Sequence, residues 1–282
     1  MKRRFQQVDV FGQGPVSGNP LAVVVDSEGL ETGEMEAITR WMNLSETAFL
    51  LPPSTGEADY RVRIFTLAGE LPFAGHPTLG SCHVWLSSGG RPQRPDTVVQ
   101  ECGVGLIPLR RGETLAFAAP PLIRSGPVDP EFLHGVARAL GVEDEEIVDS
   151  SWVDNGPGWV GLLLGDADRV LSLEPDFSRF ETQTGLDVGV VGFYPDGSDP
   201  VYEVRAFFAT DRGGMSEDPV TGSLNASVAQ WMLETDRVTV PYVAGQGTCL
   251  RRTGRIHVDR DDQGSVWVGG ATITVVEGTI DV

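Results

Sequence analysis

The chain has 282 residues, enough for about two domains that each bury a core of their own. Its net charge of −19, with acidic residues spread along the chain and no basic run, argues against nucleic acid and anionic membrane surfaces as partners. The basic start is followed by no apolar stretch of signal-peptide length, and no apolar run approaches a membrane span.

The three cysteines, Cys82, Cys102 and Cys249, are an odd number without CxxC or zinc spacing. We therefore expect reduced thiols in a cytoplasmic protein, with no structural disulfide and no metal site.

In the first half, runs rich in Val, Phe and Ile and bounded by Gly, Pro, Ser or Asp predict short strands. These runs are 6–11, 21–26, 47–51, 60–65, 98–102, 105–110 and 114–118. A helix is predicted at 33–42, capped by Thr32, and a second one at 78–86. The second helix is apolar on nearly every face, which indicates a buried helix.

A Pro-rich stretch at 119–127 predicts the linker between the halves, and a helix at 129–140 is expected to end at Gly141. A second apolar helix is predicted at 224–233. The predicted strands are 159–164, 189–194, 202–207, 238–243, 248–252, 255–259, 265–269 and 271–277. Many strands and one buried helix per half predict an α+β fold in which each half curls a sheet around a central helix.

One motif occurs twice. The segment 70–76 (ELPFAGH) aligns with 217–223 (EDPVTGS), and the strand at 60–65 (YRVRIF) aligns with 202–207 (YEVRAF). So long a period indicates two sister domains rather than a solenoid. Each copy places a helix N-terminus at its glycine, Gly75 or Gly222, and two such N-termini facing one cleft would bind a small anion.

The residues that follow the two glycines differ. His76 is predicted at the helix N-cap, where a neutral imidazole is favoured and could pass a proton, although a capping histidine without chemistry is the simpler alternative. Ser223 could hydrogen-bond a ligand or merely cap its helix.

Other acids complete the set of candidates. Asp218 aligns with Leu71, so it is either a residue specialised for catalysis or a turn-forming Asp before proline. Glu70 and Glu217 occur in both copies, which indicates a structural duty such as accepting backbone N–H groups of the turn.

Glu46 opens an apolar strand, where desolvation would raise its pKa into the range of a general acid/base; a solvated strand-edge Glu is the alternative. Asn19, in the sequence GNP, is a candidate substrate contact or simply a turn residue. The chain has no GxGxxG, no GxxxxGK[ST] and no GxSxG, so dinucleotide, nucleotide and hydrolase functions lack support.

Together, the motifs at 8–11 (VDVF), 18–20 (GNP), 45–47 (SET), 70–78 (ELPFAGHPT) and 217–223 (EDPVTGS) resemble those of the PhzF-like family, named for the phenazine biosynthesis isomerase. The resemblance covers essentially the whole chain. It implies a diaminopimelate-epimerase-like fold of two similar lobes, each a barrel-like mixed β-sheet around a central helix, with C-terminal strands swapped between lobes. The N-terminal lobe would span 1–120, completed by 271–282, and the C-terminal lobe 128–270, with the active site in the cleft.

The resemblance also implies roles for residues. Glu46 matches the family's general acid/base, and His76 and Asp218 match supporting acid/base and hydrogen-bonding residues. The backbone at Gly75 and Gly222–Ser223 matches the part that holds the substrate carboxylate. No metal or organic cofactor is implied, and a homodimer is. The Gly-rich loop at 211–216 departs from the family pattern and affects substrate fit.

The racemases and epimerases of the same fold use two opposed cysteines just before the motif glycines. Here those positions hold Ala74 and Thr221, which cannot take a proton from carbon. The sequence therefore predicts a cofactor-independent isomerase that moves a proton on a small carboxylate-bearing metabolite with Glu46. A catalytically silent small-molecule-binding protein is the alternative, and a racemase or epimerase is a weaker one.

Overall fold

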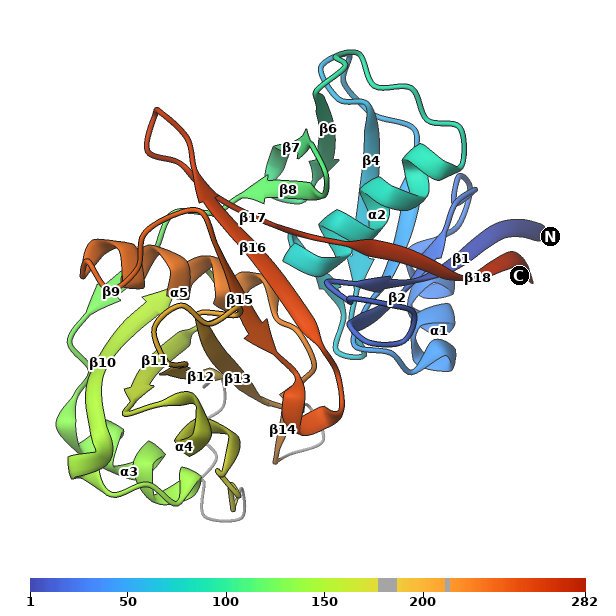
Figure 1. Cartoon of the computed structure of the whole chain (residues 1–282). Coiled ribbons are helices and arrows are strands. Elements are labelled where there is room, and N and C mark those ends of the chain that lie inside the picture. The colour runs from blue at the N-terminus through green and yellow to red at the C-terminus, as the bar shows by residue number, and fades with distance from the viewer. Residues whose placement is uncertain (177–186, 211–213) are drawn as a thin grey trace. The chain divides into compact units, whose positions relative to one another are not determined.

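The computed structural model of the chain describes residues 1–176, 187–210 and 214–282, so part of the predicted loop at 211–216 lies outside the described residues. The chain divides into two compact units (Figure 1). Unit 1 comprises Met1–Ala118 and Val268–Val282, and unit 2 comprises Ala119–Trp267. Both units combine mixed sheet with a few helices, which confirms the predicted α+β class.

Unit 1 is built mainly of strands around the buried helix α2. Its elements are β1 (Lys2–Val10), β2 (Asn19–Val24), α1 (Thr32–Met42), β3 (Thr47–Leu51), β4 (Tyr60–Phe65), β5 (Glu70–Leu71), α2 (Gly75–Ser87), β6 (Thr97–Cys102), β7 (Gly105–Arg111), β8 (Leu115–Ala118) and β18 (Thr272–Asp281). Along the chain, β1–β2 is antiparallel, β2–β3 parallel, β3–β4 and β4–β5 antiparallel, β4–β6 parallel, and β6–β7 and β7–β8 antiparallel.

Unit 2 repeats this order around helix α5. Its elements are β9 (Arg124–Gly126), α3 (Pro130–Leu140), β10 (Ile147–Asp154), β11 (Trp159–Leu164), α4 (Ala167–Leu171), β12 (Asp187–Phe193), β13 (Tyr202–Ala209), β14 (Met215–Asp218), α5 (Gly222–Glu234), β15 (Tyr242–Gln246), β16 (Gly254–Arg260) and the first part of β17 (Val266–Gly270). Here β10–β11 is antiparallel, β11–β12 parallel, β12–β13 and β13–β14 antiparallel, β13–β15 parallel and β15–β16 antiparallel.

The same sequence of pairings in both units aligns them residue by residue. Phe65 of β4 pairs with Thr47, and Phe207 of β13, its match in the sequence repeat, pairs with Val188. Thr47 and Val188 are therefore equivalent positions. The hairpins agree, because Phe65 also pairs with Glu70 and Phe207 with Glu217.

The strand that follows each copy of the repeated pairing order does not pair with the strands of that same copy. After β8 of unit 1, the chain forms β9, which pairs with β10 of unit 2. After β17, it forms β18, which pairs with β1 along nine residues of each strand. The predicted linker at 119–127 thus contains a strand, and the segment from 272 onward belongs to the sheet of unit 1.

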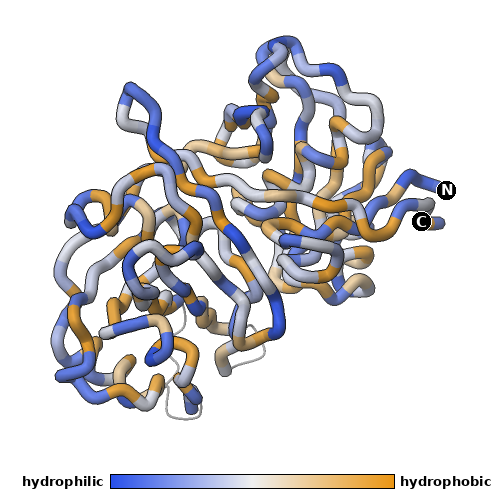
Figure 2. Tube along the Cα trace, in the orientation of Figure 1, coloured by the Kyte–Doolittle hydropathy of each residue, from blue (hydrophilic) through white to orange (hydrophobic). Residues whose placement is uncertain are grey.

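Close packing around the two buried helices explains several glycines. A side chain at Gly80 of α2 would meet Leu21 at 2.5 Å, and one at Gly189 of β12 would meet Leu224 of α5 at 2.5 Å. Figure 2 shows hydrophobic segments along the strands and a hydrophilic tip on the hairpin between β16 and β17. Within the described ranges, no helix is both long and apolar enough to cross a bilayer.

A duplicated ion pair holds each motif hairpin. Arg63 donates to both carboxylate oxygens of Glu70, at 2.7 and 2.6 Å, and Arg205 donates to those of Glu217, at 2.9 and 2.7 Å. The two glutamates thus have the expected structural duty, but the groups that donate to their carboxylates are arginine side chains rather than the turn's backbone N–H groups. Arg205 also donates to the carbonyls of Val170 and Leu173, which ties β13 to the end of α4.

Several predicted bounds are wrong for local reasons. The predicted strand at 248–252 is a 3₁₀ turn, Thr248–Leu250, flanked by Gly247 and Arg251 in left-handed conformations that a strand does not adopt. The strand predicted at 238–243 begins only at Tyr242, after Pro241. Glu31, not Thr32, is the N-cap of α1.

Among the described residues, the sequence patterns also missed several elements. The two-stranded hairpin partners β5 and β14, the short strand β9 and the one-turn helix α4 are brief, and β10 has the polar run Asp149–Ser151 in its middle. Helix α3 begins after Asp129 and ends at Gly141 in a left-handed conformation, as predicted.

Candidate active site

The predicted residues of unit 1 meet at the N-terminus of α2. This helix begins at Gly75, earlier than predicted, because Ala74 in an extended conformation is its N-cap. The prediction that His76 is the N-cap is therefore wrong. His76 is a residue of the first turn, with only 4% of its surface exposed.

Glu46 and Asn19 approach the two sides of the His76 ring. The Oε2 atom of Glu46 lies 3.4 Å from Nε2, and the Nδ2 atom of Asn19 lies 3.4 Å from Nδ1. Glu46 immediately precedes β3, and Asn19 is the first residue of β2, which pairs in parallel with β3. Asn19 is fully buried, so it is more than an exposed turn residue.

Burial fixes the charge of His76. It lowers the pKa of the imidazole from 6.5 to about 3, so the ring is neutral at physiological pH. An amide donor at Nδ1 leaves the ring proton on Nε2, the nitrogen that faces Glu46. The pair can therefore hold or pass one proton without creating a buried histidine cation.

An aspartate that the sequence analysis did not single out positions Asn19. The Oδ2 atom of Asp9 accepts the backbone N–H groups of Ser17 and Gly18, each at 2.8 Å. Gly18 is required here because a Cβ atom would lie 2.1 Å from the carbonyl oxygen of Val10. The buried carboxylate thus fixes the turn that leads into Asn19.

Unit 2 repeats this arrangement, an aspartate that accepts two backbone N–H groups of the following turn, which we call a clamp. Asp154 accepts the N–H groups of Gly156 and Gly158, at 2.7 and 2.8 Å, and it ends β10 as Asp9 lies at the end of β1. The loop it fixes leads to Trp159. A carboxylate at the end of the first strand, followed by glycines, is the sequence signal that could have identified both clamps.

Ser223 is held by this loop. The indole N–H of Trp159 donates to its hydroxyl oxygen at 3.1 Å, and the side chain of Asn155 donates to its carbonyl at 2.9 Å. Gly222 begins α5, as Gly75 begins α2. The two motif glycines therefore do place helix N-termini at matching positions of the two units.

Asp218 belongs to a hydrogen-bonded turn just before α5. Its Oδ2 atom accepts the hydroxyl of Thr221 at 2.6 Å. Gln246 donates to the Asp218 carbonyl and to the Thr221 hydroxyl, each at 3.0 Å, and accepts the Thr221 N–H and the Asn225 side chain. The turn is thus built to hold the Asp218 carboxylate in one orientation.

The cysteines stand apart from these residues. Cys82 is buried in α2, and burial raises the pKa of its thiol to about 12, so it is protonated. Burial also raises the pKa of Cys102 and of Cys249, and all three are free. Among the described residues, no group of three or more His, Cys, Asp or Glu side chains is arranged to hold a metal ion.

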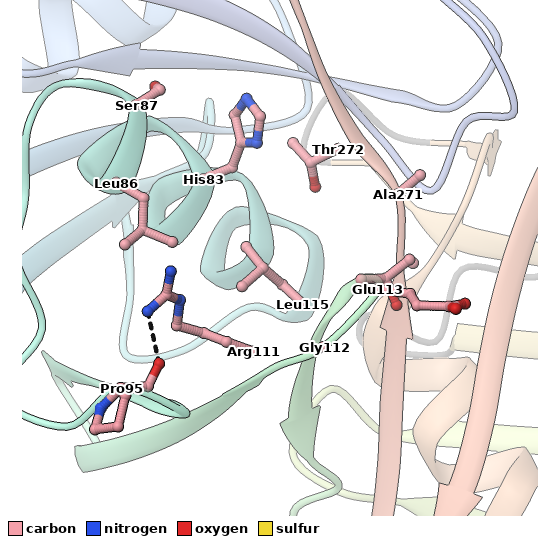
Figure 3. Close-up of a pocket in the computed structure, with 12 residues that line it drawn as sticks. His83, Leu86, Ser87, Pro95, Arg111, Gly112, Glu113, Leu115, Ala271 and Thr272 are labelled. Atoms are coloured by element: carbon pink, nitrogen blue, oxygen red, sulfur yellow. Dashed lines mark hydrogen bonds between the residues drawn. The ribbon is translucent and has the colours of Figure 1, made fainter.

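Unit 1 also has a cavity of about 690 Å³ at the other end of α2 (Figure 3). His83, Leu86 and Ser87 of that helix line it, together with Arg111 and residues at the start of β18. The Arg111 guanidinium donates to the carbonyl of Pro95. None of the predicted site residues lines this cavity.

Comparison with known proteins places these features in a family. The model of the family described as phenazine biosynthesis-like protein matches residues 8–278. A protein of Mesorhizobium japonicum named as an uncharacterized isomerase is 39% identical over 99% of this chain and 98% of its own. Trans-2,3-dihydro-3-hydroxyanthranilate isomerase of Pseudomonas fluorescens is 28% identical over 97% of each chain.

The solved structures agree with the sequence matches. The crystal structure of a PhzF-family phenazine biosynthesis protein of Enterococcus faecalis covers 100% of both chains, with a TM-score of 0.80 and 26% identity. The motifs quoted above, the two-unit α+β fold and the named isomerases among the relatives all lead to one assignment. The chain is an isomerase of the phenazine biosynthesis-like protein family, as the motifs predict.

Proposed function

We propose that the protein is a cofactor-independent isomerase that moves a proton along a small unsaturated carboxylate, with Glu46 as the acid/base. The observation that carries this proposal is the contact between the Glu46 carboxylate and the buried, neutral His76 at the N-terminus of α2. A carboxylate beside a neutral imidazole with a proton on the facing nitrogen is suited to accept a proton from carbon and to return it.

The proposed reaction is an allylic shift. Glu46 removes a proton from a carbon next to the double bond, the electron pair moves the double bond, and the same carboxyl group returns the proton to the far end of the system. The negative charge that develops spreads toward the substrate carboxylate. Backbone N–H groups at the start of a helix stabilise such a charge, and Gly75 and Gly222 each begin one.

The remaining site residues have supporting roles in this proposal. His76 presents Nε2 at 3.4 Å from the Glu46 carboxylate, and Asn19 contacts the other ring nitrogen. In unit 2, Ser223 and Asp218 bind polar groups of the substrate. The bonds from Trp159 to Ser223 and from Thr221 to Asp218 support this, because they pre-orient both side chains.

The substrate class follows from the same chemistry. A proton can move along the carbon skeleton of the substrate only if the substrate has an allylic C–H bond. A helix N-terminus favours a substrate that is an anion. The relative from Pseudomonas fluorescens is named for trans-2,3-dihydro-3-hydroxyanthranilate, so this compound is the first candidate to test.

The experiment is turnover and solvent deuterium uptake in D₂O by the native protein and by Glu46→Gln. We expect the variant to lose roughly 10²–10⁴-fold in rate, because it keeps the shape of the side chain but cannot accept a proton. Glu57→Gln, in an exposed turn, is the matched control and should keep the native rate. Full activity in Glu46→Gln would reject the proposed base.

The same experiment separates an isomerase from a silent binding protein. A silent binder would shift the melting temperature with small carboxylic acids but would exchange no substrate hydrogen for deuterium. Deuterium in the product at the carbon that receives the returned proton, in the native protein only, is the expected result.

We further propose that the protein is a cytoplasmic homodimer. Val275 and Val276 are large hydrophobic side chains exposed on β18, which supports a dimer, and the described cysteines form no disulfide, as in cytoplasmic proteins. Size-exclusion chromatography with light scattering should give twice the chain mass, and a mass equal to one chain would contradict the dimer.

A further inference from the structure

The structural repeat contains a second carboxylate at the position of Glu46. Thr47 and Val188 occupy equivalent places, because each pairs with the equivalent phenylalanine of the next strand. The residues immediately before them are Glu46 and Asp187. Asp187 is therefore the unit 2 counterpart of the proposed base.

Asp187 lies on the same face of the sheet as Asp218. In the strand β13 between them, Phe208 pairs with Asp187 and Ala206 pairs with Asp218. Residues two apart on a strand point to one face, and directly paired residues share that face. The two carboxylates thus flank β13 on one side of the sheet.

The surroundings of Asp187 come from four strands. Trp159 of β11 is its parallel neighbour, and the backbone N–H of Ala209 in β13 donates to its Oδ1 atom at 3.4 Å. The charged groups that act on it are Asp154 at the end of β10 and Asp218 of β14. Its environment therefore combines burial with two like charges and one long hydrogen bond.

Burial, followed by the repulsion from Asp154 and Asp218, raises the pKa of Asp187 from 3.8 to about 7. The side chain is consequently about half protonated at neutral pH and mostly protonated below it, unlike an ordinary aspartate. The hydrogen bond from Ala209 lowers the pKa but does not offset burial.

We propose that Asp187 is a positioning residue for Asp218, because the two side chains flank β13 on one face of the sheet and a neutral Asp187 places no second negative charge beside the Asp218 carboxylate. The proposal rests on the role proposed for Asp218 in the reaction. When Asp187 is neutral, Asp218 accepts the Thr221 hydroxyl without a second negative charge on the same face of β13. When Asp187 ionises, the two carboxylates repel, and each proton equilibrium depends on the other.

Unit 1 shows why this arrangement is specific to unit 2. The counterpart of Asp218 there is Leu71, which pairs with Ile64 as Asp218 pairs with Ala206. Glu46 therefore faces a neutral histidine, whereas Asp187 faces a carboxylate. The same position of the repeat would hold a proton-transferring base in unit 1 and a positioning residue in unit 2.

The test does not require the substrate. The carboxyl carbons of ¹³C-labelled aspartates are followed by NMR from pH 4 to 9 in the native protein, in Asp187→Asn and in Asp196→Asn, the control in an exposed turn of unit 2. We expect the Asp187 signal to titrate within about one unit of pH 7. The Asp218 signal should show a step at the same pH, which Asp187→Asn abolishes and Asp196→Asn retains.

Two results would overturn the proposal. One is an Asp187 signal that titrates with the ordinary aspartates near pH 4, and the other is an Asp218 signal without a step near pH 7. Either result would leave the proposed role of Glu46 intact, since that role is tested by deuterium uptake.

An activity profile gives the corresponding kinetic readout. With a substrate in hand, native turnover should fall roughly tenfold per pH unit above pH 7 as Asp187 loses its proton. Asp187→Asn, which mimics the protonated side chain, should lack this limb. An alkaline limb unchanged in the variant would count against the proposal.

Discussion

At the residue scale, burial lowers the pKa of His76 and keeps its ring neutral, so the stability of the folded protein depends on pH. Its pKa is about 3 in the folded protein and ordinarily 6.5, so below pH 6.5 the unfolded chain binds a proton that the folded protein does not. His76 should therefore leave the free energy of unfolding unchanged above pH 6.5 and lower it as the pH falls from 6.5 toward 3. The maximal loss is on the order of a few kcal/mol.

Replacing the histidine tests this directly. His76→Gln cannot be protonated, so its melting temperature should fall less than the native one between pH 7 and pH 4.5. His134→Gln is the control, because His134 is exposed and pairs with Asp144 at the surface. Parallel losses in the native protein and in His76→Gln would contradict the assigned burial effect.

The site residues show what a sequence alone can predict. His76, Asp218 and the motif glycines stand in strings that the repeat makes conspicuous, and Glu46 opens an apolar strand within the SET motif, so all were identifiable without a structure. Asp187 was not, because its equivalence to Glu46 follows from strand register rather than from a matching string. The predicted strand began two residues too late to include it.

At the element scale, the duplicated hairpins provide an internal comparison of one ion pair at two depths. Arg205 and Glu217 have side chains 6% and 11% exposed, whereas Arg63 and Glu70 are 25% and 40% exposed. Removing one partner of a buried pair leaves the other charge unpaired in a poorly solvated place, but water replaces a lost partner near the surface.

Glu217→Gln should therefore destabilise the protein by about 3 kcal/mol, and Glu70→Gln by less than about 1 kcal/mol. Urea unfolding monitored by tryptophan fluorescence measures both values. Equal losses would show that burial does not govern the difference and that the contacts of Arg205 with Val170 and Leu173 compensate.

Element bounds were predictable where apolar residues run without interruption and punctuation is clear, as at β3, β4 and β11. They were not predictable where tertiary contacts determine where an element begins or whether it forms. Helix α2 begins at Gly75 because Ala74 turns extended into it, which no local preference of the sequence GHPT requires. The polar middle of β10 forms a strand because Leu163, Leu162 and Gly161 of β11 pair with it.

At the scale of the whole molecule, the final strand stabilises the unit that contains the first. β18 pairs with β1 from Lys2 to Val10, so deleting residues 272–282 should expose one edge of β1. Hydrogen exchange should then lose protection in β1 and β2 of unit 1, while α5 of unit 2 keeps it. Uniform loss of protection would mean that the two units unfold as one.

The pairing of β1 with β18 also constrains how the protein is made. Gln6 and Thr274, which bond across these strands, are 268 positions apart. At the usual pace of translation, roughly 15–50 s separates the synthesis of the two strands. Unit 1 cannot fold to completion as it leaves the ribosome, because its sheet waits for a strand that is translated after all of unit 2. The nascent chain therefore carries an open sheet edge through most of its synthesis, when protection by a chaperone would matter most.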